Sequence, residues 1–444
     1  MSESILIKQA TIVNEGKTFI ADVLIKDGII ARIDKDISTH EDVRMINAEG
    51  LHLLPGCIDD QVHFREPGLT QKACIETESA AAVAGGTTSF MEMPNTRPAA
   101  LTQDLLEDKY KIAARDSHAN YSFFMGVSND NAEEVLKSNA KKQDICGVKI
   151  FMGSSTGSML VDNFVTLNKI FRDSELLIAT HCESEPVIAA NKLKYPDVHD
   201  VKYHPLIRDV EACFESSFTA VQLAKQTGAR LHILHISTAK ELQLFSNMLP
   251  LREKQITNEV CVHHLHFTAD DYARLGTLIQ CNPAIKEASN KEALWEALLD
   301  DRLDVIATDH APHTWEEKHA IYPASPSGLP LVQHSLLMML DYVNKGRISL
   351  EKVVQKMAHA PAECFQIKDR GYIREGYAAD LVLVDLKGSY TVSKENLLYR
   401  CGWSPLEGKR FPARIHTTFV NGYAAYENER VFASGMGQRL KFDR

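Results

Sequence analysis

The sequence of 444 residues lacks the marks of several protein classes. It contains neither a signal-peptide segment nor an uninterrupted apolar run of about 18 residues, the length that a membrane-spanning helix needs. Its basic residues are dispersed, and 49 of them against 59 acidic residues give a net charge of -10. Nucleic acid and anionic membranes are therefore poor candidate partners, and we predict a soluble, cytoplasmic protein.

Paired cysteines are missing as well. The nine cysteines form no CxxC pair, and several lie singly inside apolar runs. This pattern predicts buried free thiols in a reducing compartment. The sequence also contains no internal repeat of short period and no low-complexity tract.

Short alternating strand patterns are present at both ends of the chain. The first of them, ILIKQATIV, alternates as an edge strand would. Asp27 and Asn421, each followed by a glycine, predict tight hairpin turns. We therefore predict that residues 1–54 and 368–444 pair into one small, discontinuous β-sandwich domain.

Eight short apolar runs, rich in β-branched or aromatic residues, fill the region between these ends. Helical stretches separate them, such as 76–84, which Gly85 and Gly86 bring to a stop. Alternating β and α units predict a (β/α)8 TIM-type barrel over residues 55–367, with a doubly wound open sheet as the alternative. The runs cover residues 53–63, 87–93, 120–127, 146–152, 176–182, 230–237, 256–265 and 304–311.

Five of these runs carry, at or near their ends, a side chain that can bind a divalent metal or move a proton. They are His63, Lys149, His181, His235 and Asp309. A barrel of parallel strands gathers its strand ends on one face, so residues far apart in the sequence become neighbours. A catalytic zinc ion needs neutral imidazole and carboxylate donors, with one position left for water. A single such histidine is more typical of a hydrogen-bonded core residue, but the shared position predicts a metal site.

Lys149 is the unusual member of this set, because it lies inside the apolar segment CGVKIFM. A lone buried ammonium group is costly unless it loses its proton. One interpretation is a lysine whose end reaches the rim of the barrel. The other is a neutral amine that takes up carbon dioxide and becomes a carbamate, which can bridge two cations about 3.5–4 Å apart.

Seven motifs, spread in order over nearly the whole chain, resemble the amidohydrolase superfamily and, within it, the dihydroorotases most closely. They are PGCIDDQVHFREPG (55–68), MPNTRP (93–98), GVKIF (147–151), HCE (181–183), HIST (235–238), CNPAIK (281–286) and TDHAPH (308–313). The resemblance implies a zinc-dependent barrel enzyme that interconverts L-dihydroorotate and N-carbamoyl-L-aspartate, as in pyrimidine biosynthesis.

The resemblance also implies roles for the metal-binding residues. Lys149 matches the N6-carboxylated lysine that bridges the two metals, and His181 and His235 match the ligands of the more buried ion. His63 matches the second histidine of the family's HxH pair. Asp309 matches the residue that touches the other metal and acts as general base and then general acid, while metal-activated hydroxide attacks the ring amide.

A second group of residues is implied in substrate binding. Arg65 offers a planar fork suited to the carboxylate of dihydroorotate. Asn95 and His313 match the family's other carboxylate-binding positions, Asn282 matches a contact to the pyrimidine ring, and the backbone near Gly328 also matches a ring contact. A surface arginine at position 65 and turn-forming roles for the two asparagines are the alternatives.

The sequence departs from the family pattern at Gln61, which replaces the first histidine of the HxH pair. A glutamine oxygen is a neutral donor that suits hard cations better than zinc. We therefore predict one zinc ion held firmly by Lys149, His181 and His235. We predict a second, exchangeable ion on the side of Gln61, which would be a weak ligand.

Two other activities are open on the sequence alone. A hydantoinase or allantoinase would share the scaffold and the metal ligands, and a catalytically silent chain could act only as a scaffold for aspartate transcarbamoylase. Gln61 is the one feature that favours the silent chain, and the survival of the other ligands argues against it. Relatives often form dimers or larger assemblies, so a homo-oligomer is compatible with the sequence.

Two further segments attract attention without supporting a site. His263, His264 and His266 close the seventh apolar run, and we predict packing in the core or at the rim for them. GSSTGSML at 153–160 lacks the GK[ST] ending of a P-loop, so we interpret it as a loop beside the active site.

Overall fold

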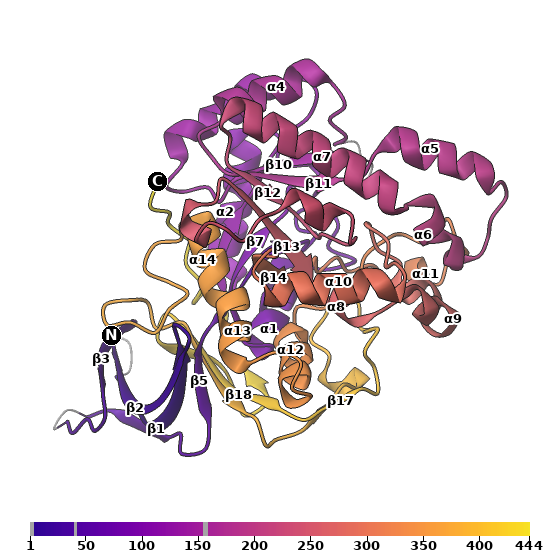
Figure 1. Cartoon of the computed structure of the whole chain (residues 1–444). Helices are drawn as coiled ribbons and strands as arrows, with labels where there is room; N and C mark the ends of the chain where they lie inside the picture. Colours follow the sequence, from indigo (N-terminus) through magenta and orange to yellow (C-terminus); the bar gives the residue numbers. More distant parts are fainter. Residues whose placement is uncertain (1–3, 40–41, 154–158) are drawn as a thin grey trace.

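The computed structural model describes residues 4–39, 42–153 and 159–444. A barrel surrounded by helices forms most of the molecule, and a smaller sheet lies below it in Figure 1. Strands from both ends of the chain build that sheet. The predicted boundaries at 1–54, 55–367 and 368–444 stay a prediction. Residues 154–158 of the predicted loop at 153–160 lie outside the described residues.

The smaller sheet has nine strands, in the order β20-β19-β18-β15-β5-β1-β2-β3, with β4 paired to β1. Strand β5 joins the two ends of the chain, because it pairs with β1 on one side and with β15 on the other. The strands are β1 (Ile5–Asn14), β2 (Lys17–Lys26), β3 (Ile29–Asp34), β4 (Arg44–Asn47), β5 (His52–Pro55), β15 (Leu381–Asp385), β18 (Arg414–Val420), β19 (Tyr423–Glu427) and β20 (Arg430–Val431). A separate small hairpin pairs β16 (Tyr390–Thr391) with β17 (Arg410–Phe411).

The predicted hairpin turns are confirmed, but the predicted edge strand is wrong. Asp27 and Asn421 have positive φ angles of 53° and 51°, as a two-residue turn between antiparallel strands requires. Strand β1 has partners on both sides, β2 on one and β4 with β5 on the other. Its residues are mostly buried without alternation, since both faces of this central strand are covered.

The barrel consists of two hydrogen-bonded groups of strands, β6-β7-β8 and β9 to β14 in sequence order. The chain itself joins β8 to β9, and the backbone N–H of His63 donates to the carbonyl of His310 at 2.7 Å, which closes the barrel between β6 and β14. The strands are β6 (Cys57–Val62), β7 (Thr87–Glu92), β8 (Asn120–Phe123), β9 (Met125–Gly126), β10 (Val148–Met152), β11 (Ile178–Cys182), β12 (Leu231–Ile233), β13 (Ile256–Cys261) and β14 (Val305–Ala307). The predicted barrel is confirmed.

Helices cover the outside of the barrel (Figure 1). They are α1 (Ile75–Ala84), α2 (Gln103–Asp116), α3 (Ala132–Leu136), α4 (Phe164–Asp173), α5 (Glu185–Lys194), α6 (His204–Ile207), α7 (Val210–Thr227), α8 (Val262–His266), α9 (Tyr272–Leu275), α10 (Ala288–Leu299), α11 (Trp315–Lys318), α12 (Ser335–Asn344), α13 (Leu350–Val354) and α14 (Ala360–Phe365). Between β12 and β13, residues 234–255 are all described and form only two 3-10 turns, at Glu241–Leu244 and Leu251–Glu253. The sixth crossover is therefore not an α-helix.

The interior of the barrel is apolar near the amino-terminal ends of the strands. Ile58, Phe124 and Leu177 belong to one buried cluster there. The end of the chain completes this cluster, because Leu440 and Phe442 are buried in it and the N–H of Leu440 donates to the carbonyl of Tyr121 at 2.9 Å. Residues near the C-terminus thus pack on the barrel and close its floor.

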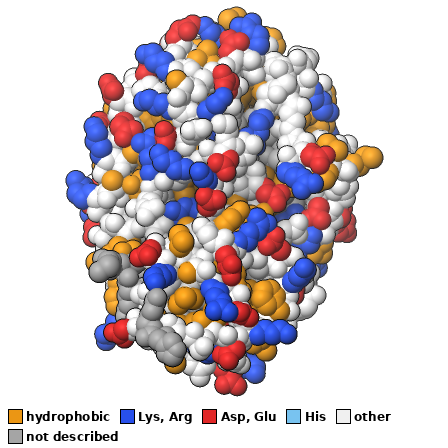
Figure 2. Space-filling model, turned by 90° about the vertical axis from the view of Figure 1, so that its left-hand side faces the viewer, with side chains coloured by type: hydrophobic (Ala, Val, Ile, Leu, Met, Phe, Trp, Pro, Cys, Tyr) orange, Lys and Arg blue, Asp and Glu red, His pale blue; other side chains and the backbone are white. Residues whose placement is uncertain are grey.

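The surface carries both signs of charge in mixture, and the face in Figure 2 shows no large area of a single sign. None of the helices in the described part of the chain combines the length and the apolar composition that crossing a bilayer requires. All nine cysteines are free thiols; eight are buried and Cys401 is half-buried. The predicted buried thiols are thus confirmed.

Candidate active site

The six predicted metal ligands line one cavity at the carboxyl-terminal ends of the strands. Gln61 is part of β6, His63 follows β6, Lys149 lies one residue into β10, His181 lies on β11, His235 follows β12 and Asp309 follows β14. The cavity has a volume of about 20 Å³, which suits one water molecule or one small ion. Lys149 is 1% exposed, so its side chain lies inside the barrel and does not reach the rim.

His181 and His235 form the centre of what we call the inner half of the site, together with Lys149. His181 Nδ1 lies 3.0 Å from His235 Nε2. Burial lowers the pKa of both imidazoles, and that of His235 falls well below its ordinary value. Both rings are therefore neutral, which is the state in which imidazole binds a metal.

A carboxylate behind His181 fixes the orientation and tautomer of its ring. Glu183 Oε2 accepts a hydrogen bond from His181 Nε2 at 3.1 Å and is itself paired with the Arg208 guanidinium. The proton on Nε2 leaves the lone pair of Nδ1 free, and Nδ1 is the nitrogen that faces His235. A ligating histidine usually has such a carboxylate on its other nitrogen.

His235 has a backbone conformation that needs support. Its φ of 42° lies in the left-handed region, which is unfavourable for a residue with a Cβ. The carboxylate of Glu259 on β13 accepts the backbone N–H of His235 at 3.1 Å. Glu259 therefore holds the turn that directs the His235 ring into the cavity.

Lys149 is buried as an amine without a hydrogen-bond partner among the described residues. Its Nζ lies 4.6 Å from the centroid of the Phe151 ring. Burial lowers the pKa of Lys149 to about 7. A large fraction of this side chain is thus neutral near pH 7, which is the form that can react with carbon dioxide.

Gln61, His63 and Asp309 form what we call the outer half of the site, and these three side chains bond to one another. Asp309 Oδ1 lies 3.1 Å from His63 Nε2 and accepts from Gln61 Nε2 at 3.2 Å. His63 Nδ1 lies 2.8 Å from Asn95 Oδ1. Burial raises the pKa of Asp309, but the hydrogen bond and the charge of His63 outweigh it, so the net shift is downward. Asp309 is thus an anionic carboxylate that can accept a proton.

These donors fit a divalent metal. Two neutral imidazoles face each other, an anionic carboxylate lies in the same cavity, and the unpartnered amine of Lys149 lies beside them. Nitrogen and oxygen donors of this kind suit zinc or another divalent metal of the first transition row.

Arg65 lines both the metal cavity and a larger cleft of about 610 Å³ beside it. It is 3% exposed, so the alternative of a surface arginine is excluded. Its Nε donates to the carbonyl of Pro312 at 3.0 Å, and one terminal nitrogen lies 3.2 Å from His313 Nε2. Among the described residues, no carboxylate lies within ion-pair distance of Arg65. Burial, with Arg65 as a further cause, lowers the pKa of His313 to about 3, so His313 is neutral.

The other predicted substrate residues lie on the same two hollows. Asn282 and Gly328 line the metal cavity, whereas Asn95 and His313 line the larger cleft. Asn282 Oδ1 accepts from Ser327 Oγ at 3.0 Å, which leaves the amide nitrogen of Asn282 without a partner among the described residues. A Cβ at Gly328 would lie 2.3 Å from the carbonyl oxygen of Ala311, so only glycine fits this wall.

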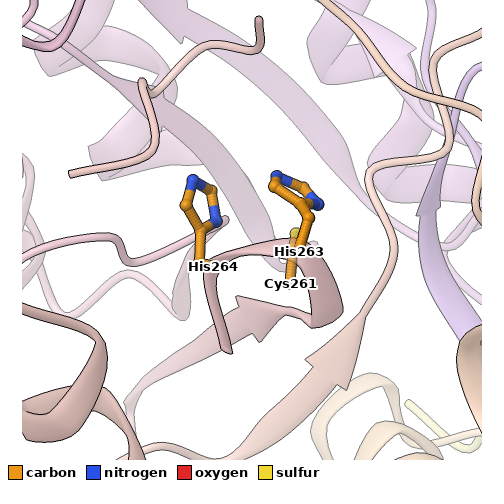
Figure 3. Close-up of side chains that lie close together, drawn as sticks. All are labelled: Cys261, His263 and His264. Atoms are coloured by element: carbon orange, nitrogen blue, oxygen red, sulfur yellow. The ribbon is translucent and has the colours of Figure 1, made fainter. Parts of the chain in front are cut away.

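The histidine-rich segment after β13 is a helix, and it does not continue the strand as predicted. Figure 3 shows His263 and His264 side by side, near Cys261. Their ring centroids are 4.2 Å apart, both are buried, and His264 Nε2 lies 3.1 Å from the carbonyl of Pro283. Neither residue lines the metal cavity, in agreement with the predicted packing role.

Sequence reasoning missed the residues that stand behind the ligands. Glu183 had a usable signal, because it lies two positions after His181 on a strand and such residues share a face. Arg208 and Glu259 had none, since they approach from other parts of the chain. Asn95 was assigned to substrate binding, whereas the structure also places it on His63.

Comparison with known proteins gives the family. The profile described as "Amidohydrolase family" matches residues 52–424. The chain is 32% identical over 418 residues to the dihydroorotase of Pyrococcus furiosus, which covers 94% of this chain and 91% of that protein. It is 30% identical over 469 residues to the allantoinase of Deinococcus radiodurans, covering 99% of each. The L-hydantoinase from Arthrobacter aurescens superposes with a TM-score of 0.93 at 28% identity, over 99% of this chain and 100% of that one.

These similarities extend over nearly the whole length of each protein. They agree with the convergence of imidazole, amine and carboxylate donors at the strand ends. The resemblance seen in the sequence motifs is confirmed. The chain belongs to the amidohydrolase family and is a metal-dependent cyclic amide hydrolase.

Proposed function

We propose that the protein is a dihydroorotase, which hydrolyses L-dihydroorotate reversibly to N-carbamoyl-L-aspartate. The observation that carries this proposal is the buried guanidinium of Arg65, which lines both the metal cavity and the cleft and has no ion-pair partner among the described residues. A buried cation without an ion pair is costly unless a ligand supplies the opposite charge. Dihydroorotate carries a carboxylate, whereas hydantoin and allantoin are cyclic amides without one.

The charge of the cleft supports an anionic substrate. Its lining contains Arg65, Lys72 and Arg97, and none of its described lining residues is acidic. The Arg65 fork can bind a carboxylate through two parallel hydrogen bonds. Asn95 and His313 lie in the same cleft as neutral partners for that group. The amide nitrogen of Asn282 can donate to a ring carbonyl.

The reacting amide would lie between the two hollows. Zinc held by Lys149, His181, His235 and the outer residues would polarise the amide carbonyl and make water acidic enough to attack at neutral pH. Asp309 accepts the proton that is released and returns it to the departing ring nitrogen. Its carboxylate is anionic and lines the cavity, as this exchange requires.

The choice of substrate can be tested by removing the charge of Arg65. In Arg65→Met, we expect kcat/KM for dihydroorotate to fall about 100-fold or more, while kcat/KM for a neutral hydantoin changes less than about threefold. Arg172→Met is the control, because Arg172 is an exposed arginine of α4 that lines neither the cavity nor the cleft, and it should change both values little. Equal losses on both substrates in Arg65→Met would instead favour a hydantoinase or allantoinase.

A catalytically silent scaffold is the remaining alternative. The zinc-loaded protein should open the ring of dihydroorotate in a direct assay, and no turnover with zinc would support the scaffold. Carboxylation of Lys149, zinc as the native metal and a homo-oligomeric state are parts of the same proposal. Mass spectrometry under native conditions, on protein purified without added metal and with bicarbonate present, tests all three.

A further inference from the structure

A second group of metal-binding side chains lies inside the barrel, apart from the cavity of the active site. It consists of Asp60 on β6, His232 on β12 and Glu259 on β13. One ligand atom from each lies within 4.8 Å of the others, and all three residues are 0% exposed. None of the three lines the cavity of the active site.

The hydrogen bonds of His232 determine which of its nitrogens faces the carboxylates. Thr257 Oγ1 donates to the carbonyl of Leu231 at 3.3 Å, so it is left to accept a hydrogen bond from His232 Nδ1 at 2.8 Å. The proton of a neutral ring is then on Nδ1. The lone pair of Nε2 therefore points toward Asp60 and Glu259.

Two carboxylate oxygens face this same nitrogen. Asp60 Oδ2 and Glu259 Oε2 each lie 3.3 Å from His232 Nε2. Neither oxygen of Asp60 has a hydrogen-bond donor of good geometry among the described residues. A buried carboxylate in this state has lost its hydration without replacement, which is costly. One oxygen of each carboxylate thus faces the same nitrogen of His232 inside the barrel.

Two of the three spacings in this group agree with a tetrahedral zinc site. In tetrahedral coordination with metal–ligand bonds of 2.0–2.1 Å, neighbouring ligand atoms lie about 3.3–3.4 Å apart. The two distances of 3.3 Å from His232 Nε2 match this value. We propose that Asp60, His232 and Glu259 bind a divalent cation of the zinc type inside the barrel, as a site separate from the catalytic metals.

A protonated His232 is the alternative to a metal at this position. Burial lowers the pKa of His232, but the hydrogen bonds and charges of Asp60 and Glu259 outweigh burial and raise it to about 9, so without a metal the ring is an imidazolium. An imidazolium is the rival occupant of this position. It offers a single Nε2 proton to two oxygens, and burial together with the charge of Asp60 raises the pKa of Glu259 to about 8, so a protonated Glu259 supplies the second proton in this alternative.

The site is connected to the active site through Glu259. One oxygen of Glu259 accepts the backbone N–H of the predicted ligand His235, and the other faces His232. A cation on the second oxygen would fix the carboxylate and, through it, the turn at His235. Its role is therefore structural support of the inner half, and this inference does not depend on which cyclic amide the enzyme hydrolyses.

The experiment counts zinc in protein that cannot hold the catalytic ions. The full-length chain carrying Lys149→Ala and His181→Asn is produced with zinc in the medium and dialysed exhaustively against metal-free buffer. Its zinc content is then measured by inductively coupled plasma mass spectrometry. We expect about one zinc per chain. Adding Asp60→Asn should reduce this to less than about one tenth of an ion. Adding Asp59→Asn, which removes a neighbouring buried carboxylate on the same strand, should leave the count unchanged.

An anomalous-scattering map at the zinc edge of the unmodified protein provides the second measurement and does not depend on the folding of any variant. We expect a peak bounded by Asp60, His232 and Glu259, in addition to density at the catalytic centre. No zinc in the Lys149→Ala, His181→Asn protein, or no peak at this position, would overturn the proposal and assign the charge to an imidazolium.

Discussion

The inner and outer halves of the metal site are built in different ways, although both arise from strand ends of the same barrel. In the inner half, Glu183 and Glu259 hold His181 and His235 from behind, and the free lone pair of His181 faces the cavity. In the outer half, Gln61 and His63 both contact the anionic carboxylate of Asp309, whereas the contact within the inner half joins the two neutral rings of His181 and His235. The inner half is thus organised before any ion arrives.

This difference indicates what the replacement of histidine by Gln61 changes. A histidine at position 61 would present a neutral lone pair, whereas the amide of Gln61 gives an N–H to Asp309. An ion entering the outer half must therefore break that bond first. Firm binding in the inner half and exchangeable binding in the outer half follow from this arrangement, and the following experiments test it.

The largest effect is expected from Asp309→Asn. The amide cannot accept the proton of the attacking water, so kcat for ring hydrolysis should fall about 1,000-fold, while the inner half keeps its zinc. Steady-state kinetics and zinc analysis on the same preparation measure both quantities. Loss of the inner zinc together with activity would contradict a division of the site into two halves.

Replacing one histidine of each half compares the contributions of the two halves to zinc affinity. His181→Asn should lose the firmly bound zinc, with an affinity at least about 100-fold weaker. His63→Asn should retain that ion. Competition with a chromophoric chelator gives the two dissociation constants, in an Asp60→Asn background so that an ion in the barrel interior is not counted. Similar losses in both variants would mean that the halves are equivalent.

The contacts that orient His181 can be weakened without changing a metal ligand. Arg208→Met leaves Glu183 without its buried cation, so His181 should lose its fixed orientation and zinc should bind about 10–100-fold more weakly. Arg172→Met, at an exposed arginine of α4, is the control. Unchanged zinc affinity in Arg208→Met would show that the inner half does not need this support.

Gln61→His should make the outer half resemble the inner one. We expect the second zinc to bind about tenfold more tightly, because a neutral imidazole is a better zinc donor than an amide oxygen. The zinc count after dialysis, again with Asp60→Asn, should rise from about one to about two per chain. A count that stays at one would show that residue 61 is not the cause of the weak zinc binding in the outer half.

A further prediction, which does not depend on bound metal, concerns the stability of the metal-free protein. The pKa of Lys149 is about 7 when folded and 10.5 as the ordinary value, so the unfolded chain binds more protons between these pH values and stability rises with pH across that window. Lys149→Met removes this dependence. It should be more stable than the parent near pH 7, by on the order of 3 kcal/mol, and the gap should narrow toward pH 10. Urea denaturation at several pH values, with chelator present, measures the gap, and a gap independent of pH would argue against a buried amine.

Much of this architecture could be predicted from the sequence, because its signals are local. All eight apolar runs became barrel strands, and the turns at Asp27 and Asn421 were found from the dipeptides that such turns require. The position of four residues near strand ends was enough to predict that they are neighbours, because a barrel of parallel strands gathers its strand ends on one face. These residues are His63, His181, His235 and Asp309.

Other features depend on contacts that no local pattern encodes. Arg208 reaches Glu183 from the segment between α6 and α7, and Glu259 reaches His235 from the neighbouring strand. The helix α8 replaced the end of a predicted strand, because apolar and histidine residues in a short run fit either structure. β1 was predicted as an edge strand, since the covering of its second side depends on strands from elsewhere in the chain.

The floor of the barrel has a consequence for how the protein is made. Leu440 and Phe442 complete the apolar interior, and the Arg444 guanidinium donates to the carbonyls of Cys146 and Phe365 at 2.7 and 2.8 Å. Synthesis proceeds from the amino terminus, so all the barrel strands leave the ribosome before these residues do. A nascent barrel would therefore expose its apolar underside until residues 440–444 have been synthesised.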